Sequence, residues 1–309
     1  MTRWTAFLGL TGVVLTLFLG LARLSQGAVR DSSGELSDVD DGSSASHSFD
    51  ADAVTDPEPG PEPGLDAEPD TEAGAGGGPE PSARREDADR HDSWDDPPEP
   101  WDDPPGVADG TPSLSTGALL ANVAVTQGLF GGILAAGAFY FEVPPSALGL
   151  GGEDLALLAV GIALGAALWV GNELAAALAD AVGAAYDENL REMLAPDSAL
   201  GWAVLFGVVL PVVALVEEFI FRAAVIGVPA AGFGTPAWAL VPVSAGAFAL
   251  GHGAQGRVGI AVTGGLGLVL AGAYAVTGSL LVVVVAHYLV NALEFLVHEL
   301  LDRPRLWSS

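Results

Sequence analysis

The sequence predicts an all-α protein: a polytopic transmembrane helical bundle of about seven spans with a long disordered acidic segment. Half of the 309 residues are apolar, and the mean hydropathy is +0.44. Several apolar stretches reach the roughly 20 residues that a helix needs to cross a hydrocarbon core. The formal charge of −28 is concentrated in one place, because residues 31–110 hold 25 of the 39 acidic residues and only 3 of the 11 arginines.

The first 30 residues are predicted to be an amino-terminal transmembrane anchor. Their apolar run extends from Trp4 to Ala22 and is flanked by Arg3 and Arg23. This length suits a spanning helix better than the shorter apolar region of a signal peptide, and no convincing A-x-A cleavage site follows it. We expect the helix to be retained, with a cleaved signal sequence as the alternative.

Residues 31–112 are predicted to be a disordered, acidic, Pro/Gly-rich tether. They hold almost no aliphatic residues and carry imperfect repeats such as PEPGPEPG. Such a segment buries too little apolar surface to offset the entropy of ordering. We expect a solvating tether suited to a halophilic organism rather than a tail that binds one partner. This acidity argues against nucleic acid as a partner, and the absence of cysteine excludes disulfides and thiolate metal ligands.

Residues 113–302 are predicted to form the transmembrane bundle. Backbone polar groups find no water in lipid, so each apolar stretch must be a helix rather than an open strand. The stretches are rich in Gly and Ala, which let helix backbones approach closely. The expected spans after the anchor are 117–141, 153–181, 199–226, 236–252, 257–276 and 278–300.

The distribution of arginines predicts the orientation in the cell membrane. With seven spans, only Arg3 and the amino terminus fall on one side, so the positive-inside rule makes the other side cytoplasmic. The acidic segment and the carboxyl terminus are then cytoplasmic. The arginines on that side are Arg23, Arg30, Arg191, Arg257, Arg303 and Arg305.

Two adjacent glutamates and an arginine lie inside the apolar stretch LVEEFIFRAAV. A charge near the bilayer centre costs about 2.5–3.5 kcal/mol on insertion scales, so a compensating interaction is expected. Glu218 and Arg222 are four residues apart and can pair on a helix, whereas Glu217 points about 100° away and has no basic residue at i+3 or i+4. An unpaired buried carboxylate is suited to act as a general base. The alternative is an ion-pair cluster of all three that locks helices together.

Two further helices carry polar residues along one stripe. In SAGAFALGH, Ser244, Phe248 and His252 follow one another at i+4 intervals. In HYLVN, His287 and Asn291 have the same spacing. A lone His on an apolar helix is usually a satisfied core residue. Two His, an Asn and an unpaired Glu on three helices are each costly in lipid, and a shared wet cavity would offset all of them.

Two more polar sites lie within the predicted spans. Asn172 and Glu173, in WVGNELAAAL, are expected to hydrogen-bond a neighbouring helix, with lining of the same cavity as the alternative. Glu294 is expected to pair with His298, four residues further on.

The motifs EEFIFR, FALGH and HYLVN on consecutive membrane helices resemble those of the CAAX-processing and bacteriocin-processing intramembrane proteases, the CPBP or Abi family. The resemblance covers a protease core at about residues 199–300. It implies an endopeptidase that hydrolyses a peptide bond of a membrane-embedded or lipidated protein or peptide. By this resemblance, Glu217 and His252 activate water, and His287 and Asn291 form the oxyanion site. The supporting residues are Glu218, Arg222 and Phe248.

The resemblance leaves the metal open, because members of this family have been called metalloproteases. A glutamate and two histidines can bind zinc, and here they would be Glu217, His252 and His287. No H-E-x-x-H motif is present. Glu217 and His252 can share a water directly, so we expect no obligatory cofactor, with zinc as the alternative.

Two other functions compete with a protease. An ion- or proton-coupled transporter also uses intramembrane Glu, His and Arg, but it predicts inverted repeats, and residues 117–181 and 199–300 show no internal repeat. A catalytically silent scaffold or immunity protein is the second rival, and the intact motifs count against it. Nothing in the sequence selects the substrate or says whether it is prenylated.

Overall fold

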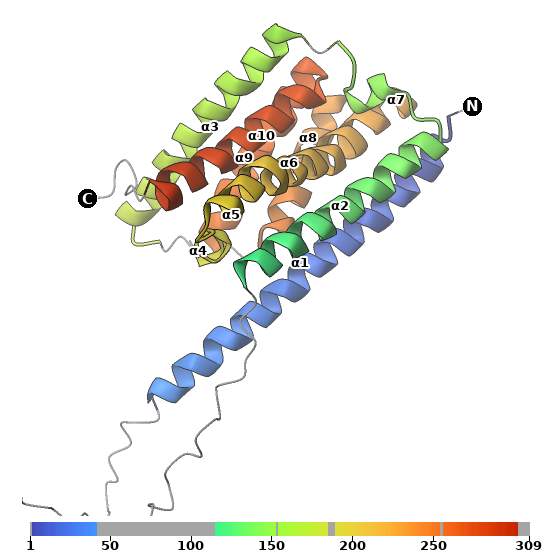
Figure 1. Ribbon diagram of the computed structural model, residues 1–309. Helices are drawn as coiled ribbons and strands as arrows, with labels where there is room; N and C mark the ends of the chain where they lie inside the picture. Colours follow the sequence, from blue (N-terminus) through green and yellow to red (C-terminus); the bar gives the residue numbers. More distant parts are fainter. Residues whose placement is uncertain (1, 42–114, 153, 185–188, 254–255, 302–309) are drawn as a thin grey trace, which may run out of the picture. The chain divides into compact units, whose positions relative to one another are not determined.

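Every regular element in the described part of the chain is a helix, as the apolar stretches predict (Figure 1). The structure is a computed structural model that describes residues 2–41, 115–152, 154–184, 189–253 and 256–301, with side chains described except at 25–41 and 189–190. Most of the predicted acidic tether, residues 42–112, therefore lies outside the described residues.

Among the described helices, six are long and apolar enough to cross a membrane, and a seventh, α8 (Ala237–Gly251), is apolar but shorter. This confirms the predicted all-α, multi-pass bundle. The six long ones are the apolar part of α1 (Trp4–Leu24), α2 (Thr116–Tyr140), α3 (Leu155–Ala181), the run Ala199–Phe233, α9 (Gly256–Thr277) and the run Leu280–Leu300.

Helix α1 extends from Trp4 to Asp41, past the predicted end of the anchor at residue 30. The predicted boundary followed the end of the apolar run, whereas a helix ends only where its backbone ladder is broken. The chain has no proline before Pro57, so nothing of that kind interrupts the ladder at residue 30.

The run Ala199–Phe233 alternates between α-helix and π-helix. It consists of α5 (Ala199–Val204), η3 (Leu205–Val209), α6 (Leu210–Glu218), η4 (Phe219–Gly227) and α7 (Val228–Phe233). Each π-helical segment ends two residues before a proline, Pro211 or Pro229. Proline lacks an N–H and clashes with the carbonyl four residues earlier, so the turn before it widens.

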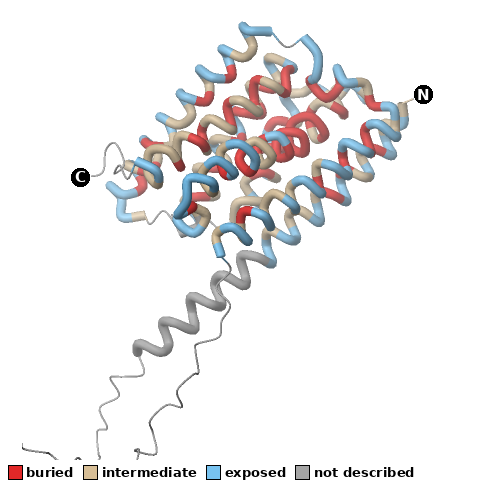
Figure 2. Tube along the Cα trace, in the orientation of Figure 1, coloured by how far each residue is buried: buried red, intermediate tan, exposed pale blue. Residues whose placement is uncertain are grey.

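This run is the central element of the bundle. Its parts α6 and η4 contact α2, α8, α9 and α10, while α1 lies beside α2, and α3 beside α10 (Figure 1). Buried residues concentrate on η4 and α10, as Figure 2 shows. Helix α10 (Leu280–Glu294) continues into the π-helical η6 (Phe295–Leu300).

Two glycines set the distance between α3 and α10. A Cβ atom on Gly161 would lie 2.9 Å from the carbonyl oxygen of Val282, and one on Gly165 would lie 2.8 Å from that of Ala286. Both distances are below any normal Cβ contact, so the backbones of α3 and α10 meet directly. The four-residue spacing of these glycines is the G-x-x-x-G pattern of close membrane-helix packing.

Gly165→Ala should therefore destabilise the protein. The added methyl group meets the backbone of α10, and overpacking of this kind costs roughly 1–3 kcal/mol. The measurement is the midpoint of thermal unfolding in detergent. Gly171→Ala, on the same helix with nothing within 4 Å of the added Cβ, is the matched control and should leave the midpoint unchanged or raise it. Equal unfolding midpoints for both variants would contradict the direct backbone contact between α3 and α10.

Candidate active site

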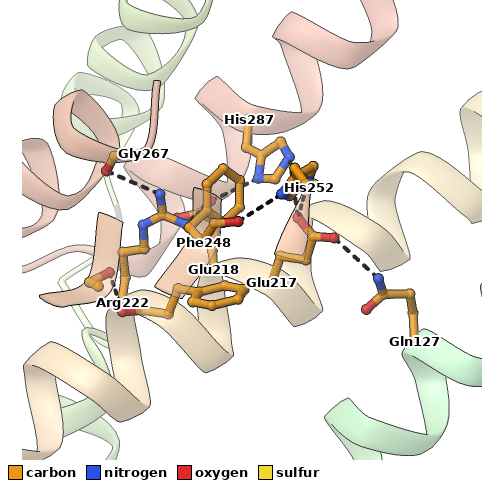
Figure 3. Close-up of polar contacts among 10 residues, drawn as sticks. Gln127, Glu217, Glu218, Arg222, Phe248, His252, Gly267 and His287 are labelled. Carbon is orange, nitrogen blue, oxygen red and sulfur yellow. Dashed lines mark hydrogen bonds and ion pairs between the residues drawn. The ribbon is translucent and has the colours of Figure 1, made fainter. Parts of the chain in front are cut away.

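The three motifs meet around one cavity in the centre of the bundle. The end of α6 supplies Glu217, the end of α8 supplies Phe248 and His252, and α10 supplies His287 and Asn291. All five line a cavity of about 530 Å³. Glu218 and Arg222 lie behind this lining, with no exposed surface (Figure 3).

The guanidinium of Arg222 is fully buried and has partners on three elements. Nη1 donates to Glu218 Oε1 at 2.9 Å, which confirms the predicted pair on one helix face. Nη2 donates to the carbonyl of Gly267 on α9 at 3.3 Å. The guanidinium carbon also lies 4.5 Å from the centre of the Phe248 ring. This cation–π contact explains why the helix that carries His252 needs an aromatic residue one turn earlier.

His287 connects the two glutamates. Its Nδ1 lies 2.7 Å from Glu218 Oε1, and its Nε2 lies 3.8 Å from Glu217 Oε2. A carboxylate in an ion pair with arginine only accepts hydrogen bonds, so the Nδ1 of His287 is the donor to Glu218. The ring therefore points its Nε2 toward Glu217.

His252 is fixed by a backbone carbonyl at the end of its helix. Its Nδ1 lies 2.9 Å from the oxygen of Phe248, which can only accept, so Nδ1 is the protonated nitrogen. Its Nε2 lies 3.8 Å from Glu217 Oε2. In the neutral ring this nitrogen presents a lone pair to the cavity.

Glu217 has one engaged oxygen and one open oxygen. Oε1 accepts a hydrogen bond from Gln127 Nε2 on α2 at 3.2 Å. Oε2 is buried and has no hydrogen-bond partner among the described residues. The distance of 3.8 Å from this atom to each histidine nitrogen is too long for a direct hydrogen bond. It is suited to one water that bridges the carboxylate and an imidazole.

The sequence analysis did not identify Gln127. It lies 90 residues before Glu217, and nothing in the chain order connects the two. The sequence did contain one signal for Gln127, because an amide side chain inside an apolar span needs a hydrogen-bonding partner.

A second polar cluster borders the cavity. Asn172 donates to Glu294 Oε1 at 2.6 Å and also lines the cavity, so it meets both descriptions considered for it. Glu173 Oε1 lies 2.8 Å from His298 Nε2. Glu294 Oε2 lies 3.8 Å from the same nitrogen, so the predicted i,i+4 residues are within ion-pair distance, although the hydrogen bond of His298 is to Glu173.

Arg191 joins this cluster from α4 (Asn189–Leu194). It donates from Nη1 to Glu294 at 3.1 Å and from Nε to Glu299 at 2.6 Å. The ligand atoms of Glu173, Glu294 and His298 lie within 4.8 Å of one another. Because Asn172, Arg191 and His298 already engage these carboxylates, we interpret the cluster as an ion-pair and hydrogen-bond network between α3, α4, α10 and η6.

The comparison with protein families places this site within a known domain. Residues 199–293 match the family described as type II CAAX prenyl endopeptidase Rce1-like. The comparison with curated proteins found no match, and the comparison with solved structures found none either. The matched segment contains every motif residue from Glu217 to Asn291, whereas Gln127 and Asn172 lie outside it. This match over residues 199–293 confirms the resemblance of that segment to the CAAX-processing family.

Arg222→Leu should unfold or strongly destabilise the protein. Removing one partner of a buried pair leaves an uncompensated charge on Glu218, at a cost of about 3–5 kcal/mol. The measurement is thermal unfolding in detergent. Arg23→Leu is the matched control, because Arg23 is exposed on α1, and it should leave the midpoint close to that of the wild type. A stable Arg222→Leu protein would show that the pair is dispensable.

Proposed function

Because residues 199–293 form an Rce1-like domain, we propose that this protein is an intramembrane endopeptidase that cleaves a membrane-embedded or lipidated protein or peptide. The observation that carries the proposal is the buried oxygen Oε2 of Glu217, which faces two histidine nitrogens at 3.8 Å across a gap suited to one water. Glu218 also has a buried oxygen without a partner, but of the two glutamates only Glu217 lines the cavity, which supports a role for Glu217 that a silent scaffold would not need.

Glu217 is the general base and His252 orients the water. The water donates one hydrogen to Glu217 Oε2 and the other to His252 Nε2, so a lone pair on its oxygen is free to attack the peptide carbonyl. As the new C–O bond forms, Glu217 takes the first proton and the carbonyl oxygen becomes an oxyanion. Glu217 then passes the proton to the amide nitrogen while the C–N bond breaks.

His287 and Asn291 stabilise the oxyanion. Asn291 offers an amide N–H from the wall of the cavity. The Nδ1 proton of His287 is held on Glu218, so its Nε2 can donate only when the ring carries a second proton. Stabilisation of the oxyanion by His287 therefore requires the doubly protonated ring, which would have the carboxylates of Glu217 and Glu218 beside it.

The same side chains carry donor atoms of the kinds that zinc binds, although among the described residues only Glu173, Glu294 and His298 bring three such atoms within 4.8 Å of one another. Glu217 Oε2 and the Nε2 atoms of His252 and His287 would be its ligands, and the bond from His287 to Glu218 is a usual support for a zinc-bound histidine. Zinc bound there would activate water as a Lewis acid. It would also occupy Glu217, and Glu218 is already engaged by Arg222 and His287. A free carboxylate base would then be missing, so we propose that zinc is not obligatory.

The substrate reaches the candidate active site from within the membrane. The cavity lies between helices that span the bilayer and is mostly apolar, with its polar groups gathered at Glu217, the two histidines and Asn291. A peptide attached to a lipid or to a transmembrane segment would present its scissile bond at this depth. The orientation that we propose places the amino-terminal end of α9, with Arg257, on the cytoplasmic side.

Glu217→Gln should lose at least about 10²-fold of the cleavage rate while keeping the fold, because it removes the base without changing the shape of the side chain. The measurement is cleavage of a membrane-peptide library by purified full-length protein, with and without a strong chelator. Glu192→Gln, an exposed glutamate on α4, is the control. Activity that survives chelation but not Glu217→Gln supports the proposal.

The other outcomes are equally informative. Wild-type activity lost under chelation would assign zinc an obligatory role. A Glu217→Gln protein as active as the wild type would remove Glu217 from the chemistry. A folded wild type that cleaves no library member would favour the scaffold or transporter functions.

Gln127→Leu should lower the cleavage rate by about 10- to 100-fold, the value expected when a hydrogen bond to a charged group is lost. Without Gln127, the carboxylate of Glu217 is free to rotate Oε2 away from the histidines. The measurement is kcat on any peptide that the wild type cleaves. Asn122→Leu is the control, because Asn122 lies on the same helix and lines the same cavity without a hydrogen bond to Glu217. Equal rates for the two variants would exclude a positioning role for Gln127.

A further inference from the structure

A second cavity, of about 750 Å³, forms a groove between α3 and α9. None of the motif residues lines it. Asn172, Val262 and Leu266 line both this groove and the catalytic cavity, and so form the wall between them. The proposed mechanism does not involve the groove, so the groove requires a separate explanation.

The groove is apolar and open. Of the side chains that line it, only Asn172 and Arg257 are polar. Gly171 on α3 and Gly265 on α9 face it with nothing within 4 Å of an added Cβ. The glycines of α3 therefore have two different effects. Gly161 and Gly165 allow direct backbone contact with α10, whereas Gly171 leaves space beside α9.

The length of the groove matches one leaflet of a bilayer. On α9 its lining extends from Arg257 to Val269, which is about 18 Å at the rise of an α-helix. On the other wall it extends from Ala184, just past the end of α3, back to Ala167 on α3. Half of a hydrocarbon core is about 15 Å thick. Because both helices are candidate spans, the groove begins near the membrane surface and ends near the midplane.

The surface end of the groove carries a positive charge. Arg257 is exposed in the first turn of α9, and it has no ion-pair partner among the residues that the structure describes. The carboxyl-terminal end of α3 lies at the same mouth as the amino-terminal end of α9, so the positive charge there comes from Arg257 rather than from the helix ends. An apolar channel one leaflet deep with a cation at its mouth matches the shape and charge of a lipid with an anionic headgroup.

We propose that the groove between α3 and α9 binds one acyl chain of an anionic phospholipid, whose phosphate pairs with Arg257. An isoprenoid chain of a substrate is the less suitable occupant, because Asn172, Val262 and Leu266 separate the groove from Glu217. The bound lipid lies directly behind Asn172, which donates to Glu294 in the cavity wall. The site does not depend on the proposed hydrolase activity.

The test is native mass spectrometry of the full-length protein, released from detergent in the presence of phosphatidylglycerol or phosphatidylcholine of equal chain length. Two variants change the groove. Arg257→Gln removes the charge, and Gly265→Leu fills the channel without a clash. Their matched controls are Arg23→Gln on α1 and Gly246→Leu on α8, which are exposed positions outside the groove, the latter with nothing within 4 Å of its Cβ.

We expect the wild type to retain phosphatidylglycerol in preference to phosphatidylcholine. Arg257→Gln should weaken retention of phosphatidylglycerol about fivefold, as expected for one arginine near an anionic headgroup. Gly265→Leu should reduce retention of both lipids, and the two controls should match the wild type. Equal retention of the two lipids by the wild type would overturn the proposal, as would a Gly265→Leu protein that binds lipid normally. A farnesylated peptide displaced by Gly265→Leu while phosphatidylglycerol stays bound would assign the groove to substrate instead.

Discussion

The buried guanidinium of Arg222 is the constraint that the rest of the site depends on. With no exposed surface, it needs charge and hydrogen-bond partners from its surroundings, and it takes them from Glu218, the carbonyl of Gly267 and the face of Phe248. These contacts fix η4 against α9 and α8. Glu218, held by Arg222, then orients the ring of His287 on α10. One ion pair thus aligns the helices that carry the chemistry.

The two adjacent glutamates have different roles because of this arrangement. Arg222 and His287 both contact the same oxygen of Glu218, Oε1, and this glutamate lies behind the lining of the cavity. Glu217 lines the cavity, accepts the amide of Gln127 on Oε1 and has no hydrogen-bond partner on Oε2 among the described residues. Glu218 therefore links the helices, and the proposed function assigns the chemistry to Glu217.

The helices and the ion pairs within one helix could be predicted from the sequence, whereas the contacts between distant helices could not. The lengths of the apolar stretches predicted the helices, and i,i+4 spacing predicted the Glu218–Arg222 and Glu294–His298 pairs. Helix formation and i,i+4 pairing both depend on local geometry. The contact from Gln127 to Glu217 and the double role of Asn172 depend on which helices pack together, which spacing does not determine. The π-helical turns before Pro211 and Pro229 follow from proline chemistry that a 3.6-residue period overlooks. Helix α8 (Ala237–Gly251) lies within the predicted span 236–252, because its apolar length was evident in the sequence.

The most direct test of the account is X-ray diffraction from crystals of the full-length protein in lipid, at a resolution that shows ordered water, with data collected at the zinc absorption edge. The account predicts a water within about 3.2 Å of both Glu217 Oε2 and His252 Nε2, with His287 Nδ1 on Glu218 and no anomalous peak between the three side chains. A zinc peak ligated by Glu217, His252 and His287, or a Glu217 carboxylate turned away from both histidines, would contradict it.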